Sequence, residues 1–152
     1  MLQNGLPGAG ALFTQQLAER IDWVRHSDRY AHPRRLARLY LNIADYPRAA
    51  IFAYEAFITS LLEEGEDVDD ADARENAVVE FREGKRGDAT RRGDLKLLAA
   101  LRNALAHGTR PKDERVRRIS RGPRELRETL TSLMDGLLGE PASLRDKGRG
   151  SR

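Results

Sequence analysis

The sequence predicts an all-α fold, an up-and-down bundle of about five helices. Along most of the chain, apolar residues recur at spacings of three and four, which is the pattern of a helix with one buried face. No segment keeps the alternation of apolar and polar residues that marks a half-buried strand. Prolines and glycines fall between the periodic stretches, where they begin and end helices.

Composition excludes several classes of site. The 152 residues contain no cysteine, which excludes a disulfide scaffold and any zinc or thiol site built on cysteine. The N-terminal stretch lacks the charged and apolar regions of a signal peptide, and no segment reaches membrane-spanning length. We therefore expect a cytoplasmic protein with a flexible leader over residues 1–10, one helical domain over residues 11–139 and a disordered tail over residues 140–152.

The chain begins with two expected helices. Residues 11–30 carry apolar residues at helical spacing and should form an amphipathic helix. His32 precedes Pro33 and ends that helix, because the residue before a proline avoids the helical conformation. Proline starts a helix well, so the next helix is expected over residues 33–43.

The following helix is expected to be the buried centre of the fold. It starts with Pro47 in its first turn and Asp45 as its cap, and it runs to about Leu62. It is apolar on nearly all sides, which is typical of a helix with no solvent face. Glu55 lies within it, and because a buried carboxylate is costly without a partner, Glu55 should meet an arginine or reach the rim.

The second half of the chain alternates loops and helices. Helices are expected over residues 73–83, 94–107 and 123–138, separated by an acidic loop over 63–72, a basic loop over 84–93 and a basic, irregular or partly helical stretch over 109–122. The first of these helices contributes Val78, Val79 and Phe81 to the core. Asp94 is expected to cap the second, and Gly108 to end it.

Acids and bases are segregated along the chain, although the net charge is only +3. Acidic residues dominate positions 63–75, and basic residues dominate after Gly84. A polyanionic partner near the second half fits this pattern. A solvated surface in a charge-rich protein fits it equally well.

The stretch from Leu101 to Gly108 gathers an arginine, an amide and a histidine at the end of a predicted helix. At about 100° per residue, one face carries the leucines that should enter the core, Leu97, Leu98, Leu101 and Leu105. Arg102 lies at the edge of this face, and Asn103 and His107 lie on the opposite side. Arg102 and His107 are about 140° apart, so they converge more easily if a two-fold contact brings in a second chain.

These residue types suit phosphodiester chemistry. His107 lies at the negative end of the helix dipole, and an imidazole can donate or accept a proton near neutral pH. Arg102 offers a forked donor for a phosphate or a developing oxyanion. The alternative is a structural role without catalysis. A histidine before a helix-ending glycine is commonly a C-terminal cap, and an arginine–asparagine pair commonly lies on the surface.

The six residues Arg102-Asn103-Ala104-Leu105-Ala106-His107 resemble the signature of HEPN domains: arginine, a polar residue that is usually asparagine, three variable positions and histidine. HEPN domains are all-α bundles that dimerise, and many are metal-independent endoribonucleases. Residues 36–56 are also similar to the helical hairpin before the catalytic helix in type III CRISPR-associated ribonucleases, in which a HEPN domain is fused to a CARF sensor for cyclic oligoadenylates. This chain departs from that pattern because no α/β region lies upstream, so activation by a ligand is not carried over.

The resemblance implies cleavage of single-stranded RNA by attack of the ribose 2′-hydroxyl on the adjacent phosphorus, at a composite site in a homodimer. His107 would act as general acid or base, Arg102 would stabilise the phosphorane, and Asn103 would orient the substrate or the histidine. No cofactor or metal is implied, and no cluster of carboxylates and histidines at ligand spacing competes with this site. Six cations are expected to hold the RNA backbone: Lys85, Arg86, Arg91, Arg92, Arg110 and Lys112.

The biological context admits alternatives. The expected role is antiviral defence of the type III CRISPR kind, in which this chain is either a stand-alone HEPN protein or an excised effector domain; a sensor domain is a candidate partner. An alternative is a HEPN toxin restrained by an antitoxin partner, and a rival of another class is a non-catalytic helical module that binds nucleic acid or proteins. Residues 36–56 also look like one tetratricopeptide unit, but a single unit cannot form a solenoid.

Overall fold

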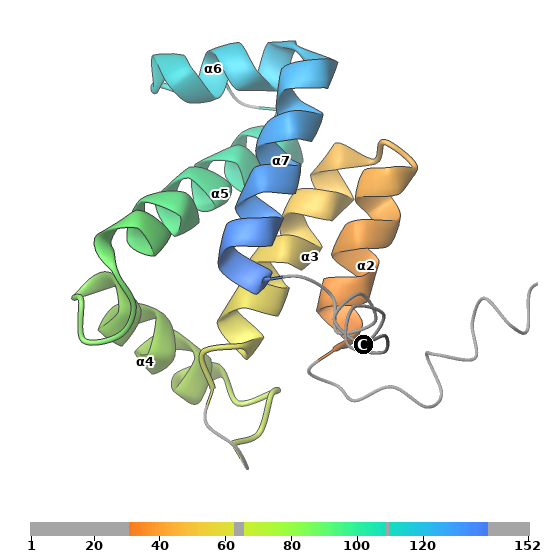
Figure 1. Ribbon diagram of the computed structural model, residues 1–152. Helices are drawn as coiled ribbons and strands as arrows, with labels where there is room; N and C mark the ends of the chain where they lie inside the picture. The colour runs from red at the N-terminus through yellow and green to blue at the C-terminus, as the bar shows by residue number, and fades with distance from the viewer. Residues whose placement is uncertain (1–30, 63–65, 109, 140–152) are drawn as a thin grey trace, which may run out of the picture.

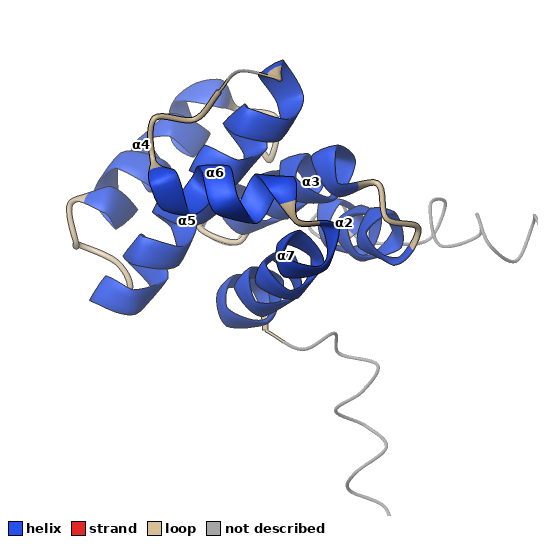
Figure 2. Ribbon diagram, turned by 90° about the horizontal axis from the view of Figure 1, so that it is seen from above, coloured by secondary structure: helices blue, strands red, loops and turns tan. Residues whose placement is uncertain are grey.

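The protein is all-α over the residues described by its computed structural model, which are 31–62, 66–108 and 110–139 (Figure 1). The helices are α2 (His32–Asn42), α3 (Tyr46–Thr59), α4 (Ala71–Arg82), α5 (Ala89–His107), α6 (Glu114–Arg121) and α7 (Pro123–Leu138). Figure 2 shows only helices and connecting loops in this part of the chain, which confirms the predicted fold class. None of these helices is long and apolar enough to cross a membrane. The expected leader, the expected helix over residues 11–30 and the expected tail lie outside the described residues.

Helices α2 and α3 form an antiparallel hairpin. The carboxylate of Asp45 caps α3 by accepting a hydrogen bond from the backbone N–H of Arg48 at 3.2 Å, as predicted. Across the hairpin the Tyr40 and Phe52 rings stack with centroids 5.4 Å apart and an interplanar angle of 8°. The hairpin is therefore held by aromatic stacking as well as by a capped turn.

Helix α3 is the centre of the fold, because it packs against α2, α4, α5 and α7. Its buried side chains are Ala49, Ala50, Ala53, Tyr54, Ala56, Phe57, Ile58 and Thr59. Many of them are alanines, which let neighbouring helices approach closely. The helix ends at Thr59 and not near Leu62. Glu55 meets Arg74 of α4 at 2.5 Å, so the prediction of an arginine partner for Glu55 is confirmed.

Helix α4 starts earlier than predicted, because Asp70 caps it by accepting hydrogen bonds from the backbone N–H groups of Asp72 and Ala73. Phe81 is buried and meets the Phe57 ring edge-on, with centroids 5.0 Å apart. The prediction that Val79 joins the core was wrong, since its side chain is 42% exposed. A short helix can bury only one narrow stripe, and Val79 is turned away from it.

Helix α5 also starts earlier than predicted. Asp88, and not Asp94, is its cap, and the Asp88 carboxylate accepts a hydrogen bond from the backbone N–H of Arg91 at 2.8 Å. Gly93 therefore lies inside the helix, and the basic loop expected over residues 84–93 ends at Asp88. A glycine inside a helix costs about 1 kcal/mol, which weakens a helix without ending it.

The basic stretch after Gly108 contains a well-formed helix, α6, which was expected only as irregular or partly helical. The Asp113 carboxylate caps it by accepting hydrogen bonds from the backbone N–H groups of Arg115 and Val116 at 2.8 and 3.3 Å. Val116 and Ile119 are buried, and α6 packs through them near α5 and α7.

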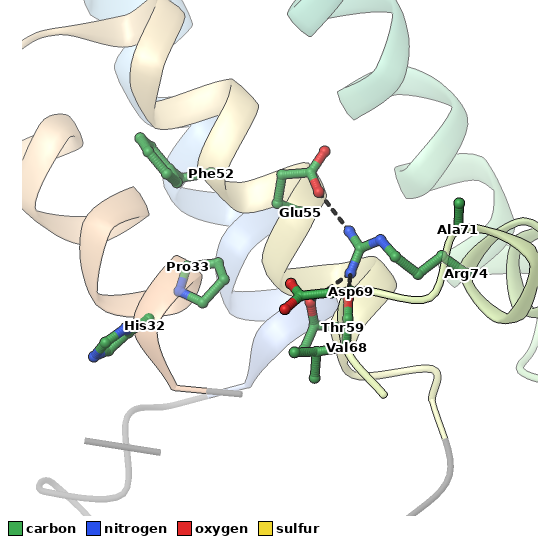
Figure 3. A pocket seen from close by; sticks show the side chains of 9 residues that line it. All are labelled: His32, Pro33, Phe52, Glu55, Thr59, Val68, Asp69, Ala71 and Arg74. Carbon is green, nitrogen blue, oxygen red and sulfur yellow. Dashed lines mark hydrogen bonds and ion pairs between the residues drawn. The ribbon is translucent and has the colours of Figure 1, made fainter. Parts of the chain in front are cut away.

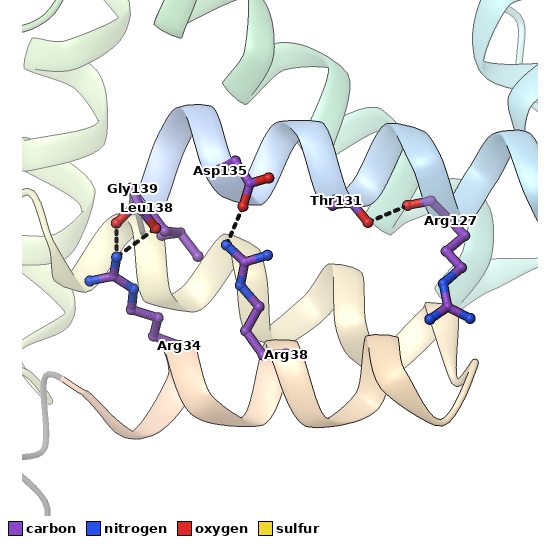
Figure 4. Close-up of polar contacts among 7 residues, drawn as sticks. All are labelled: Arg34, Arg38, Arg127, Thr131, Asp135, Leu138 and Gly139. Carbon is purple, nitrogen blue, oxygen red and sulfur yellow. Dashed lines mark hydrogen bonds and ion pairs between the residues drawn. The ribbon is translucent and has the colours of Figure 1, made fainter. Parts of the chain in front are cut away.

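Arginines from two other helices donate hydrogen bonds to the carbonyls at the C-terminal end of α7. Arg34 of α2 donates hydrogen bonds to the carbonyls of Leu138 and Gly139, and Arg91 of α5 donates to the carbonyl of Leu137 at 2.9 Å. These carbonyls have no partner within their own helix, so the guanidinium groups satisfy them. One turn earlier, Arg38 forms an ion pair with Asp135 at 2.5 Å (Figure 4). The helix has the predicted bounds, residues 123–138.

Candidate active site at the end of helix α5

Helix α5 carries Arg102, Asn103 and His107 and packs firmly against the core. Its side chains Leu95, Leu98 and Leu101 are buried, and Leu97 and Leu105 pack against the same core as partly buried residues. Arg102 is half-buried, and Asn103 and His107 are exposed. The predicted wheel is therefore correct in placing Arg102 at the edge of the core face and the other two residues on the solvent side.

Arg102 is held by two groups. Its guanidinium carbon lies 4.3 Å from the centroid of the Tyr54 ring, which is buried in α3. Its Nε and Nη2 atoms donate hydrogen bonds to Oδ1 of Asn103 at 3.2 and 3.1 Å. Neighbouring residues of a helix do not normally face each other, so the long arginine stem must turn across the helix to reach Asn103. The ring and the amide together restrict the orientation of the guanidinium plane.

The Arg102–Asn103 pair keeps hydrogen-bond donors that no described residue occupies, and Asn103 is exposed. The Asn103 oxygen is occupied by Arg102, so its remaining amide group is the NH₂, which can only donate. The guanidinium keeps unused N–H groups on Nη1, and it carries no acceptor. A surface that offers N–H donors and a positive charge is suited to the oxygen atoms of a phosphate.

His107 is the last residue of α5 and is exposed. Gly108 ends the helix in the left-handed conformation, with φ of 60°, as expected for a C-terminal stop. Among the residues described by the structure, no hydrogen bond joins His107 to Arg102. The imidazole is accessible, and within one chain it is not tied to the guanidinium.

The six cations expected to bind RNA fall into two groups. Arg110 and Lys112 are exposed and follow directly after the motif. The other four, Lys85, Arg86, Arg91 and Arg92, lie at or near the opposite end of α5. The helix rises by about 1.5 Å per residue, so its two ends are about 27 Å apart. One chain therefore does not bring these four cations to His107.

These four cations also have partners within the chain. Arg86 pairs with Glu80 at 2.9 Å and donates to the carbonyl of Leu61, Arg91 donates to α7, and Arg92 donates to the carbonyl of Gly87 at 3.1 Å. Lys85 lies 2.8 Å from Glu83, and this hydrogen bond raises the pKa of the lysine. Their contact with RNA stays a prediction. The structure shows them bonded to acidic side chains and backbone carbonyls of the chain itself.

A separate cavity of about 650 Å³ lies between α2, α3 and the segment before α4 (Figure 3). Phe52 and Glu55 line one side, and Arg74 closes another. Arg74 donates to Oγ1 of Thr59, to the carbonyl of Val68 and to Glu55, at 3.2, 3.1 and 2.5 Å. Sequence patterns did not predict this cavity, and the only signal for it was the carboxylate of Glu55 in an apolar helix. Because three of its donors are occupied, Arg74 mainly links α4 to α3 and to the segment before α4.

Tyr54 is the residue of the α5 site that sequence reasoning missed. It lies in the helix that was predicted to be the buried centre of the fold, and it is buried, but its ring also supports Arg102. Within the described ranges, no group of three or more histidine, aspartate or glutamate side chains is arranged to hold a metal ion. Comparisons with family models, with curated protein sequences and with solved structures gave no match to this chain.

Proposed function

We propose that this chain is a metal-independent endoribonuclease that cleaves single-stranded RNA at the C-terminal end of α5. The proposal rests on the Arg102–Asn103 pair, in which the asparagine oxygen accepts from the guanidinium. The NH₂ of Asn103 and the Nη1 group of Arg102 have no hydrogen-bond partner among the described residues. His107 lies exposed on the last turn of the same helix. The resemblance of these residues to the HEPN signature supports the same reaction.

The reaction is an internal transfer at phosphorus. A base removes the proton of the ribose 2′-hydroxyl, the 2′-oxygen attacks the adjacent phosphorus, and the bond to the 5′-oxygen of the next nucleotide breaks. His107 supplies this proton transfer as base, or protonates the 5′-oxygen as acid. Arg102 stabilises the negative charge on the phosphorane, and the Asn103 amide orients the phosphate. The products are a 2′,3′-cyclic phosphate and a free 5′-hydroxyl.

The site is composite and requires a homodimer. Arg102 and His107 lie about 140° apart on one helix, so a two-fold contact between α5 helices is needed to bring an arginine and a histidine onto one phosphate. The same contact places two copies of each residue in one cleft. One histidine can then act as base while the other acts as acid.

The biological setting proposed is cytoplasmic antiviral defence of the type III CRISPR kind, and it rests on the resemblance of residues 36–56 and 102–107 to that group of ribonucleases. In such a setting an activating domain or a restraining partner would control the cleavage. The chemistry proposed for α5 does not depend on this setting.

The test is incubation of purified protein with single-stranded RNA in the presence of a metal chelator. We expect cleavage with 2′,3′-cyclic phosphate ends, which is lost in His107→Ala and in Arg102→Ala while the circular dichroism spectrum is retained. Arg82→Ala is the matched control, because Arg82 is an exposed arginine on α4. Cleavage that survives both α5 substitutions contradicts the proposal. Intact RNA with tight, salt-sensitive binding indicates a non-catalytic binding module instead.

A further inference from the structure

Helix α6 carries an unusual density of arginines. Its eight residues include four arginines and one glutamate. Its apolar residues, Val116 and Ile119, are both buried. Arg115, Arg118 and Arg121 recur at intervals of three and are exposed. We call these three residues the α6 arginine face.

The position of α6 relates this face to the α5 site. Helix α6 begins at Glu114, seven residues after His107, and packs against both α5 and α7. Figure 1 shows α6 lying across the end of the bundle at which α5 terminates. The α6 arginine face and the Arg102–His107 segment therefore belong to the same end of the molecule.

The acids near α6 neutralise only part of its charge. Arg117 pairs with Glu114, and Arg118 pairs with Glu125 of α7 at 3.2 Å. In the part of the chain that the structure describes, Arg115 and Arg121 have no acidic partner. Exposed ion pairs contribute only about 0–1 kcal/mol, so Arg118 can exchange Glu125 for a phosphate at little cost.

We infer that the α6 arginine face binds the phosphate backbone of the single-stranded RNA beside the cleavage site. This inference rests on the proposed function and identifies the residues that hold the substrate. The guanidinium fork matches two oxygens of a phosphate, which a lysine ammonium does not. The face spans about 9 Å along the helix axis, which allows more than one phosphate contact.

The composition of α6 favours RNA over a membrane. A helix that lies on a lipid surface needs exposed apolar side chains, and both apolar residues of α6 are buried in the fold. The α6 arginine face is also better placed than Arg86 and Arg91, whose guanidinium groups donate to backbone carbonyls at the other end of α5.

The test measures binding without cleavage, in the His107→Ala background, by fluorescence anisotropy of a labelled oligouridine of about 20 nucleotides. The double substitution Arg115→Gln/Arg121→Gln should weaken binding about tenfold and lower the slope of log Kd against log salt by about 1.4, the value for two phosphate contacts on a single strand. The control, Arg48→Gln/Arg82→Gln, removes the same number of charges from exposed positions on α3 and α4. We expect the control to bind within about twofold of its parent.

The outcomes separate this inference from the proposed reaction. Equal losses in the two double variants, or no loss in either, overturn the assignment to α6, whatever the cleavage assay shows. Loss in the α6 variant alone supports it even if the reaction proposed for His107 fails. Displacement of the labelled RNA by polyglutamate as readily as by unlabelled oligouridine identifies an acidic protein surface as the partner and overturns the assignment to RNA.

Discussion

The Arg102 guanidinium lies against the face of the Tyr54 ring, with its carbon 4.3 Å from the ring centroid. This contact joins the last turns of α5 to α3, the most buried helix of the fold. A guanidinium supported on one side by a ring has fewer orientations to lose when it binds a phosphate. The site is therefore partly ordered before any substrate arrives.

Removing the Tyr54 ring should impair the site through Arg102. A cation–π contact stabilises by about 0.5–2 kcal/mol, so we expect kcat/KM for RNA cleavage to fall about tenfold in Tyr54→Leu. Tyr54→Phe keeps the ring and should stay within about twofold of wild type. Thermal unfolding of both variants controls for packing, because Tyr54 is buried. Equal activity in the two variants would show that the ring does not position Arg102.

Substitution of Asn103 should reveal the role of its outward NH₂. Asn103→Ala removes that donor and the acceptor of Arg102, and we expect a loss of about 10- to 100-fold in kcat. Asn103→Asp keeps the acceptor but presents a negative charge to the phosphate, so its loss should be larger. The two variants are compared in single-turnover cleavage at saturating enzyme. If Asn103→Asp is the more active of the two, donation by the amide is not part of the reaction.

The proposed composite site predicts a dimer in solution. Sedimentation velocity at micromolar protein should give a species with twice the mass of one chain, and cleavage per chain should fall on dilution as the dimer dissociates. His107→Ala should sediment in the same way, since it removes an exposed side chain. A monomer that cleaves RNA with undiminished activity per chain would contradict the composite site.

Two glycines near α5 should respond to alanine in opposite ways. At Gly87, with φ of +72°, an added Cβ would lie 2.5 Å from Cε2 of the buried Phe81 ring. We expect Gly87→Ala to destabilise by about 2–3 kcal/mol and to lower Tm by about 4–12 °C. At Gly93, inside α5, an added Cβ meets nothing within 4 Å.

Gly93→Ala is therefore the matched control for Gly87→Ala. It should stabilise the protein by about 0.5–1 kcal/mol, because alanine is the better helix former. Both are measured by thermal denaturation. A lower Tm for Gly93→Ala would contradict a helix that continues through residue 93 from its cap at Asp88.

Local signals in the sequence were sufficient for several helix ends. Pro123 and Gly139 bracket α7, and the predicted bounds are the observed ones. Asp45 was correctly chosen as the cap of α3. In each case the residue that decides the boundary is next to it in sequence, so no knowledge of the tertiary structure was needed.

The features that were predicted wrongly or missed depend on tertiary contacts. The start of α5 was misplaced because Asp88 and Asp94 are both good caps, and the glycine at 93 favoured the later one. The earlier start is supported by Arg91, whose bond to the Leu137 carbonyl joins residues 46 positions apart. The support of Arg102 by Tyr54 was missed for the same reason, since it depends on how α3 packs against α5.

The hydrogen bonds from Arg34 and Arg91 to the C-terminal carbonyls of α7 make the stabilities of α2, α5 and α7 depend on one another. Arg34 reaches the Leu138 carbonyl across 104 positions, so the bond encloses nearly all of the described chain. Loss of α2 or of the first turn of α5 would expose carbonyls of α7 at the same time. We therefore expect these three segments to open as one cooperative unit in native-state hydrogen exchange, with amides in the last turn of α7 protected as strongly as those in the hairpin.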